Sequence, residues 1–301
     1  MPWLSTVSNA FLGLLWICFA SHVVSDVDGF DLNKPFYRPV PTRLPLALVE
    51  SVDDPSRDSS SSSSLSSVLL ELDPNGPYAN FLLSEKLGLS TTQCDQLRRY
   101  CDLIVEWNDK INLVSRKDCT VDTVFGRHVV PCLAPVLLDS SQQLQDGQRV
   151  IDVGTGGGFP GIPMAICYPQ CQFLLVDSVG KKLLAVQDMV ARLQLDNVQT
   201  KHSRAEQVTG QFDWCVGRSV ASLPKYCSWI QHLLVPTNGK LLYIVGGDVP
   251  EAAQAVYERS IHDLFTDGDN DKGMILEGSS LISEKKILIF DVPAVQRMAI
   301  Q

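Results

Sequence analysis

The stretch that decides the fold reads Val150-Ile151-Asp152-Val153-Gly154-Thr155-Gly156-Gly157-Gly158-Phe159-Pro160-Gly161. A short run of β-forming residues ends in glycines, and an apolar stretch with helical character follows. Glycines at such a junction let the backbone approach a ligand and supply N–H groups at a helix N-terminus. Ligands of open α/β sheets bind where strands end and helices begin. The stretch therefore predicts a first parallel strand with a ligand site at its carboxyl end.

Two ligand patterns can be read in this loop. The segment Gly156–Gly161 fits the G-x-G-x-x-G fingerprint of dinucleotide-binding proteins, which would make the chain a nicotinamide oxidoreductase. The segment Asp152–Gly158 fits the acid-x-Gly-x-Gly-x-Gly pattern of S-adenosylmethionine (SAM) methyltransferases. The second pattern fits better, because its acid lies in the strand and its glycines follow directly. Asp177 ends the next strand run and can bind the ribose of either cofactor, so it does not discriminate.

Beyond the loop, β-rich runs alternate with helical stretches. The runs are RVIDV, QFLLV, NVQTK, FDWCV and KLLYIV, and the helical stretches lie near 161–168, 180–194, 222–234 and 249–261. This alternation predicts a parallel sheet with helices on both faces. The segment Met274–Val292 predicts two strands joined by a short connection, and the acidic segment Asp263–Glu277 predicts a solvated loop.

The segment in front of the sheet has helical periodicity. Apolar residues recur at steps of three and four between Thr92 and Ile111, and Ser90 or Thr91 can serve as the N-cap. We therefore expect a helical extension over residues 76–148 and a methyltransferase domain over residues 149–301. The predicted fold class is α/β, a Rossmann-like class I SAM methyltransferase sheet with an N-terminal helical extension.

The charge balance excludes a uniformly basic nucleic-acid-binding protein. The chain has 25 Lys and Arg against 34 Asp and Glu, a net charge of −9. Residues 178–240 nevertheless hold eight basic and four acidic side chains, a local excess that can face phosphates. The nine cysteines include no C-x-x-C pair and no histidine lies at zinc-finger spacing, so we expect reduced core thiols and no metal.

The N-terminal part differs from the rest. Residues 1–20 resemble a signal peptide, since the apolar run Ala10–Ala20 is shorter than the ~20 residues of a membrane-spanning helix. Residues 21–75 contain six prolines and the run Ser59–Ser64, with little apolar periodicity, and predict a disordered or processed leader. Such a two-part leader resembles the plastid-import leaders of complex algae. We expect no membrane segment in the mature form.

Six ordered blocks of sequence resemble one known family. They are the glycine loop IDVGTGGGFPGIPMAI, the segment WNDKINLVSR at 107–116, the pair Arg127-His128, and the segments 176–182, 203–206 and 217–223. Outside the loop, the matching family patterns are W-N-x-x-x-N-L-[TV]-S, R-H, L-D-S-x-x-K-[KR], R-x-E and S-R-A-x-A-x-L. The blocks cover most of residues 79–245 and resemble the bacterial small-subunit rRNA guanine-N7 methyltransferases, also called glucose-inhibited division protein B.

This resemblance implies SAM as cofactor and guanine N7 in small-subunit rRNA as the target. The cofactor residues that it implies are Asp152, Gly154, Gly156, Phe159, Asp177, Ala205, Glu206 and Arg218. Asp177 would hold the ribose, Ala205 and Glu206 would lie beside the adenine, and Arg218 would lie where cofactor meets RNA. Neutral guanine has a free lone pair on N7, so no general base is needed. The catalytic candidates are positioning residues only, namely Arg218, His128 and Arg127.

The RNA candidates are basic residues near the predicted strand ends: Lys181, Lys182, Arg204 and Lys225. Because this basic footprint is weak, we expect a shaped partner, the small ribosomal subunit or its rRNA, rather than any RNA. We expect a monomer. An rRNA substrate together with a secretory-type leader predicts a plastid location, with the mitochondrion or the cytosol as alternatives.

Two places depart from the family pattern. The family's R-H-x-x-D-S continues here with Pro131 and Cys132, and its L-K-G after the fifth strand reads Ile244-Val245-Gly246. The missing polar groups could have served RNA. Two alternatives therefore remain open: a SAM methyltransferase that acts on a small molecule, and a non-catalytic SAM- or RNA-binding assembly factor.

Overall fold

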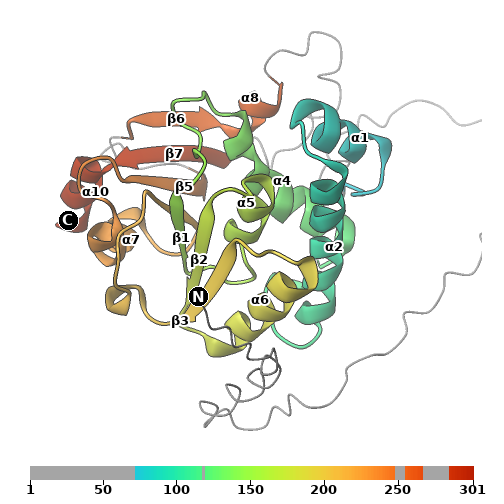
Figure 1. Cartoon of the computed structure of the whole chain (residues 1–301), viewed down its shortest axis with the longest axis horizontal. Coiled ribbons are helices and arrows are strands. Elements are labelled where there is room, and N and C mark those ends of the chain that lie inside the picture. The colour runs from blue at the N-terminus through green and yellow to red at the C-terminus, as the bar shows by residue number, and fades with distance from the viewer. Residues whose placement is uncertain (1–71, 117–118, 248–254, 267–284) are drawn as a thin grey trace, which may run out of the picture. The chain divides into compact units, whose positions relative to one another are not determined.

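The computed structural model describes residues 72–116, 119–247, 255–266 and 285–301 (Figure 1). The signal-peptide-like segment and nearly all of the predicted leader lie outside the described residues. Among the helices that are described, none is both long and apolar enough to cross a membrane.

One seven-stranded sheet organises the described part, with its strands in the order β3-β2-β1-β4-β5-β7-β6. The parallel strands are β1 (Arg149–Val153), β2 (Gln172–Asp177), β3 (Val198–His202), β4 (Trp214–Arg218) and β5 (Lys240–Gly246). β7 (Lys285–Asp291) runs antiparallel to β5 and to β6 (Tyr257–Ser260). The strand order reverses between β1 and β4, so a crevice is expected at the carboxyl ends of these two strands. The predicted Rossmann-like α/β sheet is confirmed.

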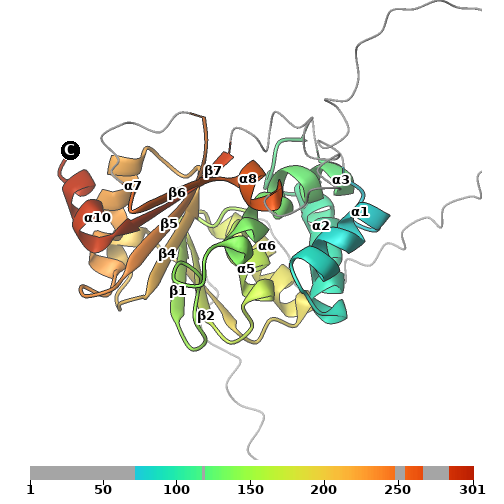
Figure 2. The ribbon, with the colours of Figure 1, turned by 90° about the horizontal axis from the view of Figure 1, so that it is seen from above.

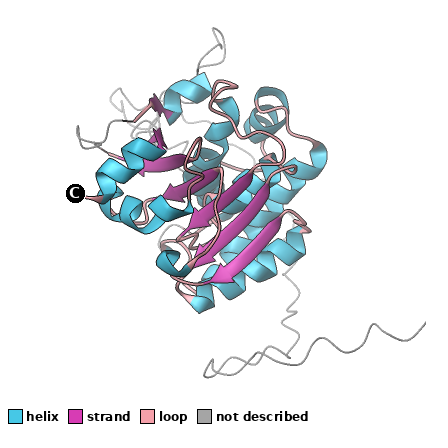
Figure 3. Cartoon of the chain, turned by 60° about the vertical axis from the view of Figure 1, so that its left-hand side comes forward, coloured by secondary structure: helices cyan, strands magenta, loops and turns pink. Residues whose placement is uncertain are grey.

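Helices cover both faces of the sheet, as the twisted strands in Figure 3 show. α2 (Thr91–Asn108), α5 (Gly161–Cys167) and α6 (Gly180–Leu193) pack on one face, whereas α7 (Leu223–Ile230) and α10 (Val292–Ala299) pack on the other (Figure 2). Successive residues of each strand point to opposite faces of the sheet and so pack in different cores. Leu242 packs with the α2 side and Leu241 with the α7 side, and both are fully buried. The two apolar cores account for the strong hydrophobicity of the central strands.

The helical extension shares its core with the sheet. α2 is preceded by α1 (Pro77–Asn80) and by a π-helical turn over Phe81–Lys86. It is followed by α3 (Val121–Thr123) and by a second π-helical turn over Val124–Val129. The extension ends with α4 (Val130–Leu133) and a 3-10 turn over Ala134–Leu137. Ser90 is the N-cap of α2, as predicted. Its hydroxyl accepts from the Gln93 N–H, and the Gln93 side chain accepts from the Ser90 N–H, which forms a capping box.

Hydrogen bonds from several α2 side chains tie the helix to the rest of the fold. The Tyr100 hydroxyl donates to the Gly157 carbonyl at 2.8 Å, and the Trp107 indole N–H donates to Asp188 of α6 at 2.7 Å. At the end of the helix, the buried Asn108 side chain accepts from the N–H groups of Leu113 and Val114. The first residues of the WNDKINLVSR block therefore have a structural task, which is to hold the end of α2 against α6 and the segment that follows.

Two expectations for the C-terminal part need correction. The helix predicted near 249–261 is wrong in its described portion, where Tyr257–Ser260 forms the edge strand β6. The solvated loop is wrong for residues 263–266, which belong to α8 (Ile261–Thr266); Leu264 and Phe265 are buried there, and the rest of that segment lies outside the described residues. A four-residue edge strand carries too little alternation to be read from sequence.

The end of the chain is partly as predicted. β7 confirms the second of the two expected C-terminal strands, while the first lies outside the described residues. The sequence reading missed α10, which starts with a proline in its first turn and is capped by Asp291, whose carboxylate accepts from the Ala294 N–H. The eight described cysteines are free thiols, and most are buried, in agreement with the expectation of reduced core residues.

Candidate active site

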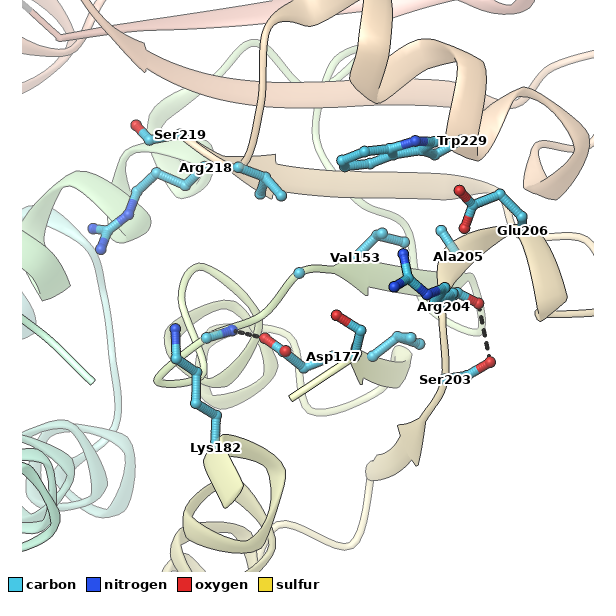
Figure 4. A pocket seen from close by; sticks show the side chains of 15 residues that line it. Val153, Asp177, Lys182, Ser203, Arg204, Ala205, Glu206, Arg218, Ser219 and Trp229 are labelled. Atoms are coloured by element: carbon cyan, nitrogen blue, oxygen red, sulfur yellow. Dashed lines mark hydrogen bonds between the residues drawn. The ribbon is translucent and has the colours of Figure 1, made fainter. Parts of the chain in front are cut away.

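A cavity of about 340 Å³ opens at the carboxyl ends of β1 to β4, where the strand order reverses (Figure 4). This volume is in the range of sites for small molecules. Six of the eight predicted cofactor residues line it: Gly154, Gly156, Asp177, Ala205, Glu206 and Arg218. The other two, Asp152 and Phe159, are buried and are not among the lining residues.

The glycine loop needs its glycines for reasons of backbone and space. Gly154 has φ +75°, a left-handed value, and a Cβ added to it would lie 2.6 Å from the Cγ1 of Val220 on the cavity wall. A Cβ on Gly161 would lie 2.6 Å from a carboxylate oxygen of Asp152. No side chain fits at either position without displacement of a neighbour. The backbone next to the cavity is therefore kept bare, as close approach by a ligand requires.

Asp152 holds the loop together from below. One of its carboxylate oxygens accepts from the Thr155 hydroxyl at 2.7 Å and from the Gly161 N–H at 2.9 Å. The other oxygen forms no hydrogen bond with the described residues. Burial raises the pKa of this carboxyl to about 7. The acid of the glycine pattern thus shapes the loop from the core side, at a distance from the cavity wall.

Asp177 lies on the cavity wall with its carboxylate held in place. One oxygen accepts from the Gly156 N–H at 2.9 Å, and the other accepts from the Val179 N–H at 2.8 Å. Figure 4 shows the first of these bonds. A carboxylate oxygen can accept more than one hydrogen bond, so both oxygens keep capacity for further donors. The arrangement suits two neighbouring hydroxyl groups, as in a ribose.

An apolar wall faces Asp177 across the cavity. Ala205 follows β3 in a 3-10 turn over Ala205–Gln207, and the indole of Trp229 from α7 lies above it in Figure 4. Glu206 adds a carboxylate beside this wall. The sequence reading missed Trp229. The ammonium of Lys225, one helical turn earlier, lies 5.5 Å from the centre of the indole.

Arg218 is held by neutral partners from another part of the chain. It donates to the carbonyl of His128 at 2.9 Å and to its ring Nδ1 at 3.0 Å, and it lies 4.6 Å from the centre of the Phe159 ring. Because arginine can only donate, Nδ1 must be unprotonated, and the imidazole carries its proton on Nε2. Burial and the charges of Arg218, Lys285 and Arg127 lower the pKa of His128 to about 3.

The structure thus brings the three positioning candidates together. Arg127 and His128 lie on the π-helical turn after α3, and Arg218 ends β4 at the cavity. Phe159 lies beneath the guanidinium and also packs against Tyr100 and His128. Phe159 therefore supports the Arg218 guanidinium by packing against it.

Comparison with known proteins identifies the family. A family model described as rRNA small subunit methyltransferase G matches residues 93–265, more than half of the chain. The chain belongs to this family. The ribosomal RNA small subunit methyltransferase G of Chlorobium chlorochromatii is 39% identical over 220 residues, which cover 72% of this chain and 92% of that protein. The corresponding protein of Chlorobaculum tepidum is 42% identical over 195 residues, or 64% of this chain and 87% of that protein.

The methyltransferase G family assignment confirms the resemblance inferred from the six blocks. The family protein of Flavobacterium johnsoniae is 39% identical over 183 residues, which are 59% of this chain and 85% of that protein. The sheet agrees, since its order and its antiparallel β7 are those of the predicted class I methyltransferase fold.

The departures from the methyltransferase G pattern have identifiable places. Pro131 and Cys132 are buried on α4, and the Cys132 thiol donates to the His128 carbonyl at 3.0 Å and lies 3.6 Å from a guanidinium nitrogen of Arg218. Burial raises the pKa of this thiol, which suits a packing role. Val245 is half-buried and packs against the apolar core on the α7 side.

The RNA candidates divide into two pairs. Lys182 and Arg204 line the cavity itself, whereas Lys181 and Lys225 are exposed at the helix starts next to it. All four therefore lie at the edge of the sheet where the strands end. In the described part of the chain, no group of three or more His, Cys, Asp or Glu residues could hold a metal ion.

Proposed function

We propose that this chain transfers a methyl group from SAM to N7 of a guanine in small-subunit ribosomal RNA. The observation that carries the proposal is family membership combined with a cavity at the strand ends that suits a nucleoside. The relatives of the chain are named for methylation of small-subunit ribosomal RNA. N7 specificity comes from the resemblance of the sequence blocks.

The residues present fit a SAM cofactor. Asp177 would hold the ribose hydroxyls. Ala205 and Trp229 would form the apolar wall against the adenine, and Glu206 would accept a hydrogen bond from its amino group. The bare backbone at Gly154 gives the close approach that such a ligand needs. When bound, SAM supplies a methyl group that is electrophilic because it is attached to a sulfonium.

The task of the protein in this reaction is positioning. Guanine N7 is unprotonated in the neutral base, so no side chain has to remove a proton. Arg218 lines the cavity, and its guanidinium is held by the His128 carbonyl and Nδ1. We assign Arg218 the orientation of the target nucleotide. His128, with a pKa of about 3, stays neutral at physiological pH and keeps Arg218 in place.

The proposed partner is the small ribosomal subunit or its rRNA. Lys181, Lys182, Arg204 and Lys225 surround the cavity, and we assign them to backbone phosphates. Because the chain as a whole is acidic, affinity is expected to depend on the shape of the substrate. A monomeric state stays a prediction.

A transfer assay tests the proposal. Purified protein is incubated with methyl-labelled SAM and with small ribosomal subunits that lack the guanine methylation. We expect label in RNA, sensitivity of that label to RNase, and strand scission at the modified guanine after borohydride reduction and aniline treatment. Label that resists RNase would favour the small-molecule alternative. Cofactor binding without transfer would favour the assembly-factor alternative.

The location of the protein is proposed on the same basis. The relatives act in bacteria, so we expect a substrate ribosome of the bacterial type, and the leader pattern of residues 1–75 suits import into a plastid. A fluorescent fusion that carries residues 1–75 is expected to enter plastids. Retention in the cytosol or entry into mitochondria would contradict the plastid assignment.

A further inference from the structure

A group of basic side chains lies behind Arg218. Arg127 and His128 come from the π-helical turn, Arg218 from β4, and Lys285 from the first position of β7. The Lys285 ammonium donates to the Arg127 carbonyl at 2.8 Å, and Arg218 donates to the next carbonyl, that of His128. Two cationic side chains from neighbouring parts of the sheet therefore converge on the same turn.

These charges face neutral partners. Arg218 contacts a carbonyl, an imidazole nitrogen, a thiol and the Phe159 ring, and Lys285 contacts a carbonyl. Within the described residues, no carboxylate pairs with Arg218 or Lys285. The acid whose field reaches Arg218 is Asp152, which is itself buried.

The physical consequence is mutual repulsion. Burial, together with the charges of Arg218 and Arg127, lowers the pKa of Lys285 to about 8. Like charges held close together and partly out of water cost free energy unless a counter-charge joins them. Such an arrangement is typical of a site that is completed by an anionic ligand.

The backbone position opposite Lys285 is open among the described residues. Gly246 is the partner of Lys285 in the β5–β7 register, so both positions lie on the same face of the sheet. No described atom lies within 4 Å of the place where a Cβ on Gly246 would be. Lys285 uses one of its three N–H groups on the Arg127 carbonyl, which leaves two for an oxyanion.

We propose that Arg218 and Lys285 form a subsite for a backbone phosphate of the RNA, next to the nucleotide that is methylated. This inference rests on the proposed function and adds a second wall to the substrate site. Arg218 is shared with the cofactor cavity, whereas Lys285 is not among the residues that line that cavity. A phosphate on Lys285 would therefore lie on the substrate side, apart from the cofactor.

The test compares two neighbouring lysines on β7. Lys285→Met removes the subsite charge and keeps much of the side-chain length. Lys286→Met is the matched control, because Lys286 points to the opposite face and pairs with Glu258 at 2.7 Å. We measure the KM for undermethylated small subunits, the salt dependence of subunit binding, and calorimetric binding of S-adenosylhomocysteine, the demethylated cofactor.

We expect Lys285→Met to raise the KM for subunits about ten-fold, as for loss of one charged hydrogen bond. The slope of log binding constant against log salt, which is negative, should become less steep by about 0.7 to 0.9, the value for one phosphate contact. Cofactor affinity should not change, Lys286→Met should behave as wild type, and Lys285→Arg should restore most of the loss.

The outcomes separate this inference from the proposed function. If wild type methylates subunits and Lys285→Met has the wild-type KM and salt slope, the phosphate subsite is wrong while the function stands. If wild type binds subunits with a Lys285-dependent salt slope but transfers no methyl group, the function is wrong while the subsite stands. A loss of cofactor binding in Lys285→Met would also overturn the assignment to the substrate side.

Discussion

At the scale of single residues, the space between Gly154 and Val220 on the cavity wall is too small for an added side chain. Gly154→Ala places a Cβ 2.6 Å from Val220 Cγ1 and also strains a backbone with φ +75°. Gly156→Ala is the matched control, because Gly156 has φ +61° and its nearest neighbour would be a carbonyl oxygen at 3.9 Å. Calorimetry with S-adenosylhomocysteine should show an affinity loss at least ~10-fold greater for Gly154→Ala.

A second substitution checks the cause of that loss. Val220→Ala in the Gly154→Ala background removes the methyl groups that the new Cβ would meet, and should recover part of the affinity. If the two glycine variants lose affinity equally, backbone strain alone accounts for the glycine loop and the steric argument is wrong.

Trp229 gives the cavity an optical signal. Its indole lines the wall above Ala205, so a bound adenine would contact it and change its fluorescence. Trp229→Leu should weaken S-adenosylhomocysteine binding by about five- to ten-fold, the usual value of an aromatic contact, and should abolish most of the emission change. The control variant is Trp214→Phe, because Trp214 is buried on β4 and is not among the residues that line the cavity. An unchanged signal in Trp229→Leu would contradict contact with the adenine.

At the scale of elements, α2 supports the glycine loop through one hydroxyl group. Tyr100→Phe removes the bond to the Gly157 carbonyl and leaves that buried oxygen unpaired, at a cost of about 1–3 kcal/mol. Trp107→Phe removes the bond to Asp188, which keeps Arg192 as a partner. Both variants should lose stability to urea, but only Tyr100→Phe should also weaken S-adenosylhomocysteine binding. If both variants bind S-adenosylhomocysteine as tightly as wild type, the Tyr100 hydroxyl has no influence on the glycine loop.

The same elements show what sequence could and could not predict. The five parallel strands, the capping of α2 and most of the cavity wall follow from local patterns, because apolar runs, caps and glycines act within a few residues. β6 and Trp229 could not be found in this way. The edge strand exists because β7 pairs with it, and Trp229 reaches the cavity because α7 packs against the sheet. Both depend on contacts between distant segments.

Residue roles within a matched motif were also beyond the sequence. Asp152 and Asp177 each follow an apolar run and look alike in one dimension. In the structure, Asp177 lies on the cavity wall and Asp152 lies in the core beneath the loop. Lys285 belongs to no motif that the sequence analysis could single out. Its position beside Arg218 arises only when β7 inserts between β5 and β6.

At the scale of the whole molecule, Asp152 makes stability depend on pH. Its carboxyl has a pKa of about 7 in the folded chain and about 3.9 when unfolded, so the folded state holds an extra proton between these values. The unfolding free energy of wild type should therefore fall as pH rises from 5 to 7, by up to about 1.4 kcal/mol per pH unit from this group.

Asp152→Asn isolates this contribution. The amide oxygen can still accept from Thr155 and Gly161, while the amide nitrogen replaces an oxygen that has no partner among the described residues. At pH 5 the protonated carboxyl of wild type has one O–H without a partner and the amide has two such N–H groups, so the variant should be slightly less stable than wild type there. Relative to the variant, wild type should lose stability as pH rises to 7, and the difference between the two unfolding free energies should stay constant above about 8, because only wild type ionises at this position. Urea titrations at several pH values measure the difference, in which all other titrating groups cancel. Parallel curves for the two proteins would mean that Asp152 is ionised in the fold at pH 5, and that the loop stabilises a buried carboxylate.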